Sequence, residues 1–204
     1  MTARDLFQRA GALLIDLDGT LVDSSGPVRR VWYAFAARHG LDADAVNQFA
    51  HGRPSRESVR LLAPDADHAA EAALVERTEV EDTHGVRALP GAHELLASRL
   101  PLAIVTSCST ALAHARLQAA ALAVPDVLVS ADHVQQGKPD PTCFLLAAQR
   151  LNVPAAQCVV FEDAPAGIEA GRAAGAVVIA LRTTHSDDHL TRADVVVDDL
   201  AALR

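Results

Sequence analysis

The sequence predicts an α/β protein: a doubly wound, Rossmann-like parallel sheet core with an inserted all-helical cap domain. From residue 90 onward, short apolar runs alternate with stretches of helical periodicity, which is typical of a parallel sheet with crossover helices. Residues 24–86, in contrast, show one helical pattern after another and no strand-like run. We therefore expect an α/β core of residues 1–22 and 87–204, interrupted after its first strand by a helical insert of residues 23–86.

Each element of the core can be assigned from its hydrophobic pattern. Short apolar runs predict strands at residues 12–15, 102–106, 127–130, 158–161 and 177–181, with an edge strand at 193–197. Helical spacing predicts helices at residues 92–99, 110–121, 141–151 and 165–174. In the insert, the first helix is expected at residues 28–41, where His39-Gly40 is a helix-stop signal.

Composition and charge exclude several classes of protein. Half of the 204 residues are hydrophobic, which excludes disorder and is enough for one substantial core. The net charge of -8 argues against a nucleic-acid or anionic-membrane surface, and no apolar run approaches the ~18 residues needed to span a bilayer. Three cysteines without CxxC spacing indicate neither a disulfide framework nor a zinc site. We expect a cytoplasmic monomer with a small-molecule partner, and neither nucleic acid nor membrane as a partner.

Two acidic residues follow the first predicted strand, in the string DLDGTLVD (residues 16–23). Positions two apart on an extended chain point to the same side, so Asp16 and Asp18 can converge. Two adjacent carboxylates repel each other unless one is protonated or a cation lies between them. The pair therefore indicates a general acid beside a nucleophile, a metal site, or both. The simpler alternative is an acidic turn that caps the next segment.

A group of hydroxyl-bearing residues, TSCST (residues 106–110), lies between a predicted strand and the helix that follows it. Hydroxyls and free backbone N–H groups at a helix N-terminus can bind an anion. Ordinary N-capping by Ser109 or Thr110 is the alternative interpretation. Both interpretations can hold, because they concern neighbouring residues.

Lys138 is the only lysine in the chain, whereas the other 17 basic residues are arginine. It lies in the stiff turn GKPDP (residues 137–141), where a helix is expected to begin. A compact ammonium on a flexible stem suits one phosphoryl oxygen or a carboxylate in a crowded site, where a guanidinium fork is too broad. The alternative is a solvated surface lysine.

Glu162 and Asp163 follow a further predicted strand and precede a helix that carries Gly167, Gly171 and Gly175. Adjacent carboxylates at a strand end repel each other and suit the coordination of a hard cation. The glycines, spaced four apart, are expected to allow close packing of the helix on the sheet. Taken together, the strand ends offer four carboxylates, several hydroxyl or N–H donors and one ammonium. This set is what Mg²⁺-assisted transfer of a phosphoryl group requires.

On these motifs the chain resembles the haloacid dehalogenase (HAD) superfamily. Its four signatures are matched in order by DLDGTLVDS (residues 16–24), AIVTSCST (103–110), GKPDP (137–141) and VFEDAPAGIEAG (160–171). The helical insert is similar to the small helical cap of the sugar-phosphate phosphatases and β-phosphoglucomutases. The resemblance covers the whole chain and implies a fold of the same kind.

The resemblance also implies a role for each matched residue. Asp16 would be the nucleophile that forms an aspartyl-phosphate, and Asp18 would protonate the leaving oxygen and then activate water. Mg²⁺ would be held by Asp16, the backbone carbonyl of Asp18, and Asp163, with Glu162 as a ligand or just outside the ligand sphere. Lys138 would neutralise charge on the phosphoryl group and on the nucleophile.

Phosphate binding is implied for residues 106–109. Thr106 or Ser107 would hydrogen-bond the phosphoryl oxygens, and the local sequence offers both. Cys108 and Ser109 lie in the same stretch, and Lys138 completes the expected phosphate-binding set.

Substrate choice is expected to lie in the helical insert. Two of its stretches match parts of the cap that face the site, or return to the core, in enzymes acting on sugar or polyol phosphates. The expected substrate-binding residues are His51, Gly52, Arg53, Ser55, Arg56, Glu79 and Asp82. The alternatives are plain surface charge for the arginines and a solvated helix face for the acidic residues.

We therefore expect a Mg²⁺-dependent phosphatase that hydrolyses a small sugar or polyol monophosphate. A β-phosphoglucomutase-like phosphomutase is the alternative for the same site. When Trp32 is aligned with the family's tryptophan, Val28 stands where the mutases carry a histidine, which counts against the mutase. A non-catalytic sugar-phosphate-binding protein is the alternative from another class, and the complete set of carboxylates argues against it.

Replacement of Lys138 by arginine tests the special role of the single lysine. We expect Lys138→Arg to lower kcat substantially and to leave the fold intact, because the broader guanidinium cannot replace an ammonium in a crowded site. kcat is measured on p-nitrophenyl phosphate and the fold by far-UV circular dichroism. Turnover close to that of the wild type would show that any cation serves at this position.

Overall fold

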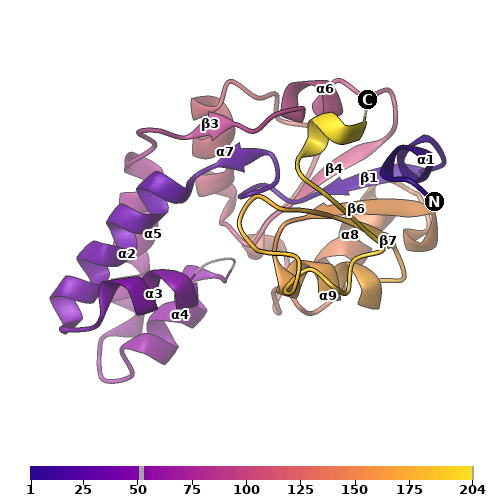
Figure 1. The fold of residues 1–204 in the computed structure, drawn as a ribbon. Coiled ribbons are helices and arrows are strands. Elements are labelled where there is room, and N and C mark those ends of the chain that lie inside the picture. The colour runs from indigo at the N-terminus through magenta and orange to yellow at the C-terminus, as the bar shows by residue number, and fades with distance from the viewer. Residues whose placement is uncertain (51–52, 204) are drawn as a thin grey trace.

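The fold comes from a computed structural model and is described for residues 1–50 and 53–203 (Figure 1). Within these ranges the core is a six-stranded sheet of order β5-β4-β1-β6-β7-β8, in which every neighbouring pair is parallel. The strands are β1 (Ala12–Ile15), β4 (Leu102–Val105), β5 (Val127–Val129), β6 (Cys158–Glu162), β7 (Val177–Leu181) and β8 (Val195–Val197). The expected doubly wound parallel sheet is therefore confirmed.

The strand order reverses at β1, which has β4 on one side and β6 on the other. In a doubly wound sheet, the connections on the two sides of such a point diverge, so the carboxyl ends of the strands open a crevice there. The residues that follow β1, β4 and β6 are therefore delivered to one place.

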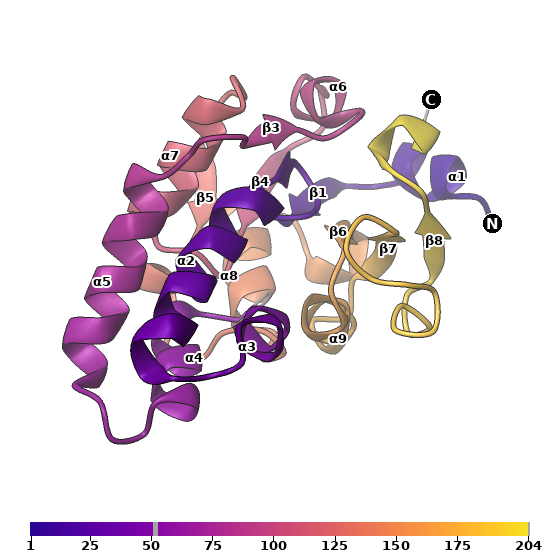
Figure 2. The ribbon, with the colours of Figure 1, turned by 60° about the vertical axis from the view of Figure 1, so that its left-hand side comes forward.

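Helices cover both faces of the sheet (Figure 2). Side chains alternate along β1, so Leu13 and Ile15 join one hydrophobic cluster, whereas Ala12 and Leu14 join the other. The first cluster is covered by α1 (Ala3–Gln8), α6 (Ala92–Leu96) and α7 (Thr110–Ala119), and the second by α8 (Thr142–Arg150) and α9 (Pro165–Ala173). Short 3-10 helices lie at η1 (Ala131–His133), η2 (Ala155–Gln157) and η3 (Leu200–Leu203).

The helical insert forms a second body beside the sheet (Figure 1). It contains α2 (Ser25–His39), α3 (Ala43–Ala50), α4 (Ser55–Leu62) and α5 (His68–Glu81). These helices bury a core of their own around Trp32, Phe35 and Val75. The antiparallel strands β2 (Val22–Asp23) and β3 (Arg87–Ala88) pair where the chain leaves and re-enters the core. In the described part of the chain, no helix is both long and apolar enough to cross a membrane.

The boundaries of most elements agree with the sequence analysis to within a few residues. β1 and β7 have the predicted bounds, and β8 is the edge strand. α2 begins at Ser25 rather than at residue 28, and it ends at His39, where the φ of 66° at the following Gly40 confirms the helix-stop signal. The sequence analysis did not predict α1 or the β2–β3 pair, because six residues and two residues are too few for a hydrophobic period to be recognised.

Leu14 tests the central position of β1. Its side chain is fully buried against α8 and α9, so Leu14→Ala leaves a cavity beneath the middle of the sheet. We expect this variant to lower the free energy of unfolding by about 2–5 kcal/mol. The matched control is Leu145→Ala on α8, where the leucine is exposed, with an expected change within about 0.5 kcal/mol. Urea denaturation measures both, and equal effects would contradict the assignment of Leu14 to the core.

Candidate active site

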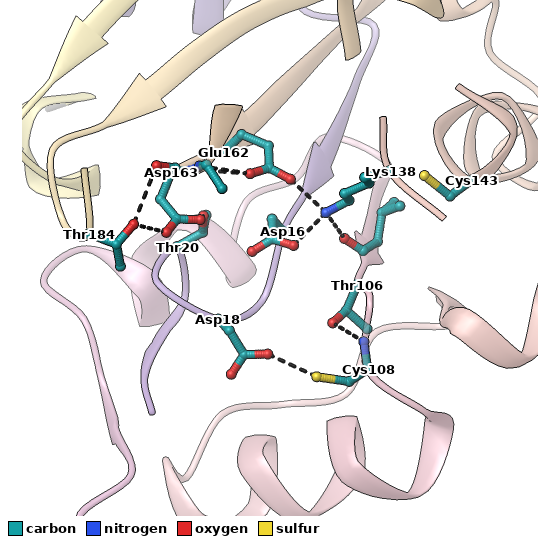
Figure 3. A network of polar contacts seen from close by, with 12 residues as sticks. Asp16, Asp18, Thr20, Thr106, Cys108, Lys138, Cys143, Glu162, Asp163 and Thr184 are labelled. Carbon is teal, nitrogen blue, oxygen red and sulfur yellow. Dashed lines mark hydrogen bonds and ion pairs between the residues drawn. The ribbon is translucent and has the colours of Figure 1, made fainter. Parts of the chain in front are cut away.

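The residues that follow β1, β4 and β6 meet at the carboxyl edge of the sheet, where the core faces the helical insert (Figure 3). They line a cavity of about 490 Å³, a size that suits a small molecule. Core and insert both contribute to its wall. The core supplies Asp16, Asp18, Thr106, Lys138, Glu162 and Asp163, and the insert supplies Val28, Trp32, Arg53, Ser55, Arg56 and Glu79.

Lys138 lies at the centre of the polar groups of the core. Its Nζ donates to Asp16 Oδ1 at 2.5 Å, to Glu162 Oε1 at 2.6 Å and to the backbone carbonyl of Val105 at 3.0 Å, so all three ammonium donors are used. Burial alone would lower the pKa of Lys138, but the two carboxylates outweigh it and raise the pKa above its usual value. The side chain is 5% exposed, which excludes the alternative of a solvated surface lysine.

Asp16, Glu162 and Asp163 form a cluster of buried carboxylates, in which one oxygen of each lies within 4.8 Å of one oxygen of each of the others. Burial raises the pKa of Asp16 to about 8 despite the opposing charge of Lys138, and the charge of Glu162 adds to this shift. Burial raises the pKa of Asp163 well above its usual value, and the charges of Glu162 and Asp16 add to this shift. With all three ionised, Lys138 offsets one negative charge and two remain. An all-oxygen group with this excess charge suits a divalent cation.

Asp163 is fixed from two sides. The hydroxyl of Thr184, in the loop after β7, donates to its carboxylate. On the other side, Gly19 has a φ of +80°, and a Cβ there would lie 2.2 Å from Asp163 Oδ2. Glycine is therefore required both by the turn and by the carboxylate that lies against it. The sequence analysis did not identify Thr184, because it follows β7 without a recognisable motif.

Asp18 is turned toward Cys108 rather than toward Lys138 (Figure 3). Its Oδ1 accepts from the Ser24 hydroxyl at 2.6 Å, and its Oδ2 lies 2.6 Å from Arg116 Nη1 and 3.0 Å from Cys108 Sγ. Burial alone would raise the pKa of Asp18, but these three donors, Arg116 above all, hold the pKa below its usual value. Ser24 precedes α2 without capping it through its side chain, because its hydroxyl is directed to Asp18.

Arg116 is a buried residue of α7 that the sequence analysis did not identify. In addition to Asp18, it contacts Glu79 of α5, with 3.2 Å between Arg116 Nη2 and Glu79 Oε1. The Ser55 hydroxyl donates to the other oxygen of Glu79 at 3.2 Å. Burial raises the pKa of Glu79, and the charge of Arg116 opposes this shift. The sequence offered no signal for Arg116, because an arginine in the last turn of a helix usually complements the helix dipole.

Residues 106–109 line the cavity. Thr106 is buried and its Oγ1 accepts the backbone N–H of Cys108 at 3.1 Å, whereas Ser107 is half-buried. Ser109 is the N-cap of α7 and accepts the backbone N–H of Leu112 at 3.3 Å. The capping interpretation is therefore confirmed for Ser109, and phosphate binding by this stretch stays a prediction.

Only some of the expected substrate-binding residues of the insert that the structure describes lie on the cavity wall. Those on the cavity wall are Arg53, Ser55, Arg56 and Glu79. Asp82 is not among the described residues that line the cavity, and it pairs instead with Arg30 at 2.7 Å. The substrate-binding role expected for Asp82 is not supported by this position. His51 and Gly52 lie outside the described residues.

The three glycines of α9 and its C-terminal turn differ in what surrounds them. A Cβ on Gly171 would lie 3.0 Å from Val178, so this glycine allows the expected close packing on the sheet. A Cβ on Gly167 would lie 1.8 Å from Glu162 Oε1, so this glycine leaves room for the carboxylate. Gly175 follows the helix with a φ of +81°. The expectation of close packing on the sheet therefore holds for Gly171 and for Gly167, which lies against Glu162 at the end of β6, and it is wrong for Gly175, where an added Cβ would meet nothing within 4 Å.

Comparison with known proteins agrees with the fold and identifies the family. Residues 11–175 match the family described as haloacid dehalogenase-like hydrolase. The chain is 44% identical over 199 residues to hexitol phosphatase A of Escherichia coli (strain K12), covering 94% of this chain and 92% of that protein. It is 35% identical over 186 residues to fructose-1-phosphate phosphatase YqaB of the same strain, covering 87% and 99%. The chain therefore belongs to the haloacid dehalogenase-like hydrolases, and it is an enzyme of that family.

A solved structure of β-phosphoglucomutase from Clostridium difficile has the same architecture. Its TM-score is 0.85, and the match covers 96% of this chain and 93% of the mutase. The sequence identity is 22%, so the likeness concerns the fold alone. The arrangement of a helical insert beside an α/β core is thus shared with a mutase.

Gly167→Ala tests whether activity depends on the position of Glu162. The added Cβ meets the carboxylate, which must move away from Lys138, and we expect kcat to fall about 10- to 100-fold. The control is Gly26→Ala on α2, where the nearest atom to an added Cβ is Arg30 Nη1 at 3.5 Å and activity should be retained. kcat on p-nitrophenyl phosphate is measured together with the melting temperature. Unchanged turnover by a folded Gly167→Ala protein would contradict this account of Glu162.

Proposed function

We propose that the protein is a Mg²⁺-dependent phosphatase that hydrolyses a small sugar or polyol monophosphate through a phosphorylated Asp16. The observation that carries the proposal is the buried group of three carboxylates and one ammonium, which faces a cavity shared by core and insert. The relatives named as hexitol phosphatase and fructose-1-phosphate phosphatase support a polyol or sugar phosphate as the substrate class.

The proposed Mg²⁺ ligands are Asp16, Asp163 and the backbone carbonyl of Asp18. The excess negative charge of the carboxylate cluster fits a divalent cation, and hard cations prefer oxygen ligands. Glu162 has donors at both oxygens, Lys138 at Oε1 and two backbone N–H groups at Oε2, so we assign it the role of orienting the site. When bound, Mg²⁺ neutralises charge on the phosphoryl oxygens and on the nucleophile.

In the first proposed step, Asp16 attacks the phosphorus. Lys138 holds Asp16 Oδ1, and Oδ2 forms the new bond to phosphorus. The bond between phosphorus and the oxygen of the alcohol breaks, and Asp18 gives its proton to that oxygen. The hydroxyls of Thr106 and Ser107 donate to the phosphoryl oxygens, with Lys138 as the positive charge beside them.

In the second proposed step, water attacks the phosphorus of the aspartyl-phosphate. Asp18 accepts the proton of the water, the bond between phosphorus and Asp16 breaks, and inorganic phosphate leaves. The contacts of Asp18 with Ser24, Cys108 and Arg116 favour its ionised form, which is the form that accepts this proton. To act as the acid in the first step, Asp18 carries the proton on Oδ1 and gives it to the leaving oxygen, while Oδ2 stays paired with Arg116.

The helical insert is proposed to act as a cap that holds the alcohol part of the substrate. Arg53, Ser55, Arg56 and Glu79 present charged and hydroxyl groups to the cavity, and such groups suit the hydroxyls of a sugar or polyol. A closed insert would exclude bulk water while the cavity still admits the one water that attacks.

Val28 favours hydrolysis over phosphomutase activity. It lines the cavity at the position where the β-phosphoglucomutases carry a histidine. An apolar side chain cannot take up or release a proton there. The site therefore has Asp18 as its acid and base, which is sufficient for hydrolysis of a monoester.

A screen of phosphate esters tests the proposed function. The purified protein should release inorganic phosphate from hexitol, other polyol or sugar monophosphates without a sugar bisphosphate activator. EDTA should abolish this release and excess Mg²⁺ should restore it, because the carboxylate cluster needs the cation. Asp16→Asn removes the nucleophile at nearly unchanged volume and should reduce turnover to the background of a mock preparation.

Two outcomes of this screen would contradict the proposal. Dependence on a sugar bisphosphate, with no net release of phosphate, would establish a phosphomutase. Binding of a sugar phosphate without turnover of any ester would establish a binding protein.

A further inference from the structure

Arg116 spans the boundary between the core and the helical insert. It belongs to α7 of the core, and its side chain is 5% exposed. One nitrogen of its guanidinium lies 2.6 Å from Asp18, which follows β1, and another lies 3.2 Å from Glu79 of the insert. The helices that carry Arg116 and Glu79, α7 and α5, lie side by side (Figure 2). One side chain thus joins the residue proposed as acid and base to the insert.

The orientation of Asp18 depends on this link. Its Oδ2 is held by Arg116 and Cys108, and its Oδ1 by Ser24 at the start of α2. A guanidinium is planar with its nitrogens in a fixed fork, so the contact of Nη2 with Glu79 restricts the direction in which Nη1 meets Asp18. If the insert moves away from the core, Glu79 leaves with α5 and Arg116 loses this anchor.

Charge compensation of Asp18 alone does not explain Glu79. Arg116 already offsets the charge of Asp18, and a second carboxylate at 5% exposure costs free energy of desolvation. Glu79 contacts Arg116 of the core and the Ser55 hydroxyl of α4 within the insert, and of these two contacts the one with the charged Arg116 crosses the boundary. The Glu79 carboxylate can thus contact Arg116 only when the insert lies against the core.

We propose that Arg116 is a positioning residue, which holds the Asp18 carboxyl in its working place only while the insert is closed and Glu79 occupies the second arm of the guanidinium. The inference rests on the role of Asp18 in the proposed function. It means that closure of the insert assembles acid catalysis, so an ester bound to the open form is cleaved without effective help from Asp18.

The test compares two esters of similar shape that differ in their need for a proton. Benzyl phosphate releases an alkoxide that must be protonated, whereas p-nitrophenyl phosphate releases a stable phenolate. Neither carries sugar hydroxyls that Glu79 could bind. For benzyl phosphate, we expect kcat/KM to fall about 100-fold in Arg116→Met and about 10-fold in Glu79→Gln, with much smaller losses for p-nitrophenyl phosphate. kcat/KM reports the steps up to cleavage of the ester bond, in which Asp18 acts as the acid.

Two further variants serve as controls. Arg38 also pairs with a glutamate of α5, Glu71 at 2.9 Å, but this pair lies within the insert and on its surface. Arg38→Met should therefore change both rates by no more than about twofold. Arg116→Lys keeps the charge without the fork and should restore part of the benzyl phosphate rate. Thermal melts establish that each variant is folded, and Glu79→Gln with Arg116→Lys decides the outcome if Arg116→Met does not fold.

Equal losses on the two esters, or no loss in a folded Glu79→Gln protein, would overturn the role of Arg116. Asp18→Asn, measured alongside, separates this inference from the proposed function. If Asp18→Asn shows no preference between the esters, the proposed role of Asp18 is wrong and the inference falls with it. If Asp18→Asn is selective and the Arg116 and Glu79 variants are not, the inference alone is wrong.

Discussion

The structure depends most on one electrostatic constraint: three buried carboxylates lie together at the end of the central strand, and one ammonium, that of Lys138, pairs with two of them. Ionised carboxylates are costly to bury side by side unless cations compensate for them. The chain supplies one cation in Lys138, and in our proposal Mg²⁺ supplies the remaining charge. The backbone adapts to the same group, because a side chain at Gly19 or Gly167 would collide with Asp163 or Glu162. The reversal of strand order at β1 brings these residues together.

Much of the fold and of the carboxylate site could be predicted from the sequence, because the signals for both are local. Apolar runs bounded by polar residues define β1 and β7, and parallel strands must bring their carboxyl ends to one edge. The polar groups at the ends of β1, β4 and β6 therefore indicated one site, and the uniqueness of Lys138 in the composition indicated a buried role. Ser24, Thr184 and Arg116 could not be predicted in this way. Thr184 and Arg116 are brought to Asp163 and Asp18 by packing between separate segments of the chain, which no local pattern records. Ser24 lies near Asp18 in sequence, but the pattern does not show whether its hydroxyl caps α2 or bonds to Asp18.

The helical insert contributes more than a cover for the site. Its helices share a core of their own around Trp32 and Phe35, and two of its polar side chains extend to the catalytic carboxylates or their partners. Ser24 and Glu79 both reach Asp18, the first directly and the second through Arg116. The part of the molecule proposed to hold the substrate is thus connected with the residue proposed to transfer the proton.

The most direct test of the account concerns the covalent step. Protein quenched in acid during turnover, digested and analysed by mass spectrometry, reports which residue carries phosphate. The account predicts phosphate on the peptide that contains Asp16, and none when the substrate is omitted. Phosphate attached to any other residue, or a quenched protein that carries none during turnover, would contradict it.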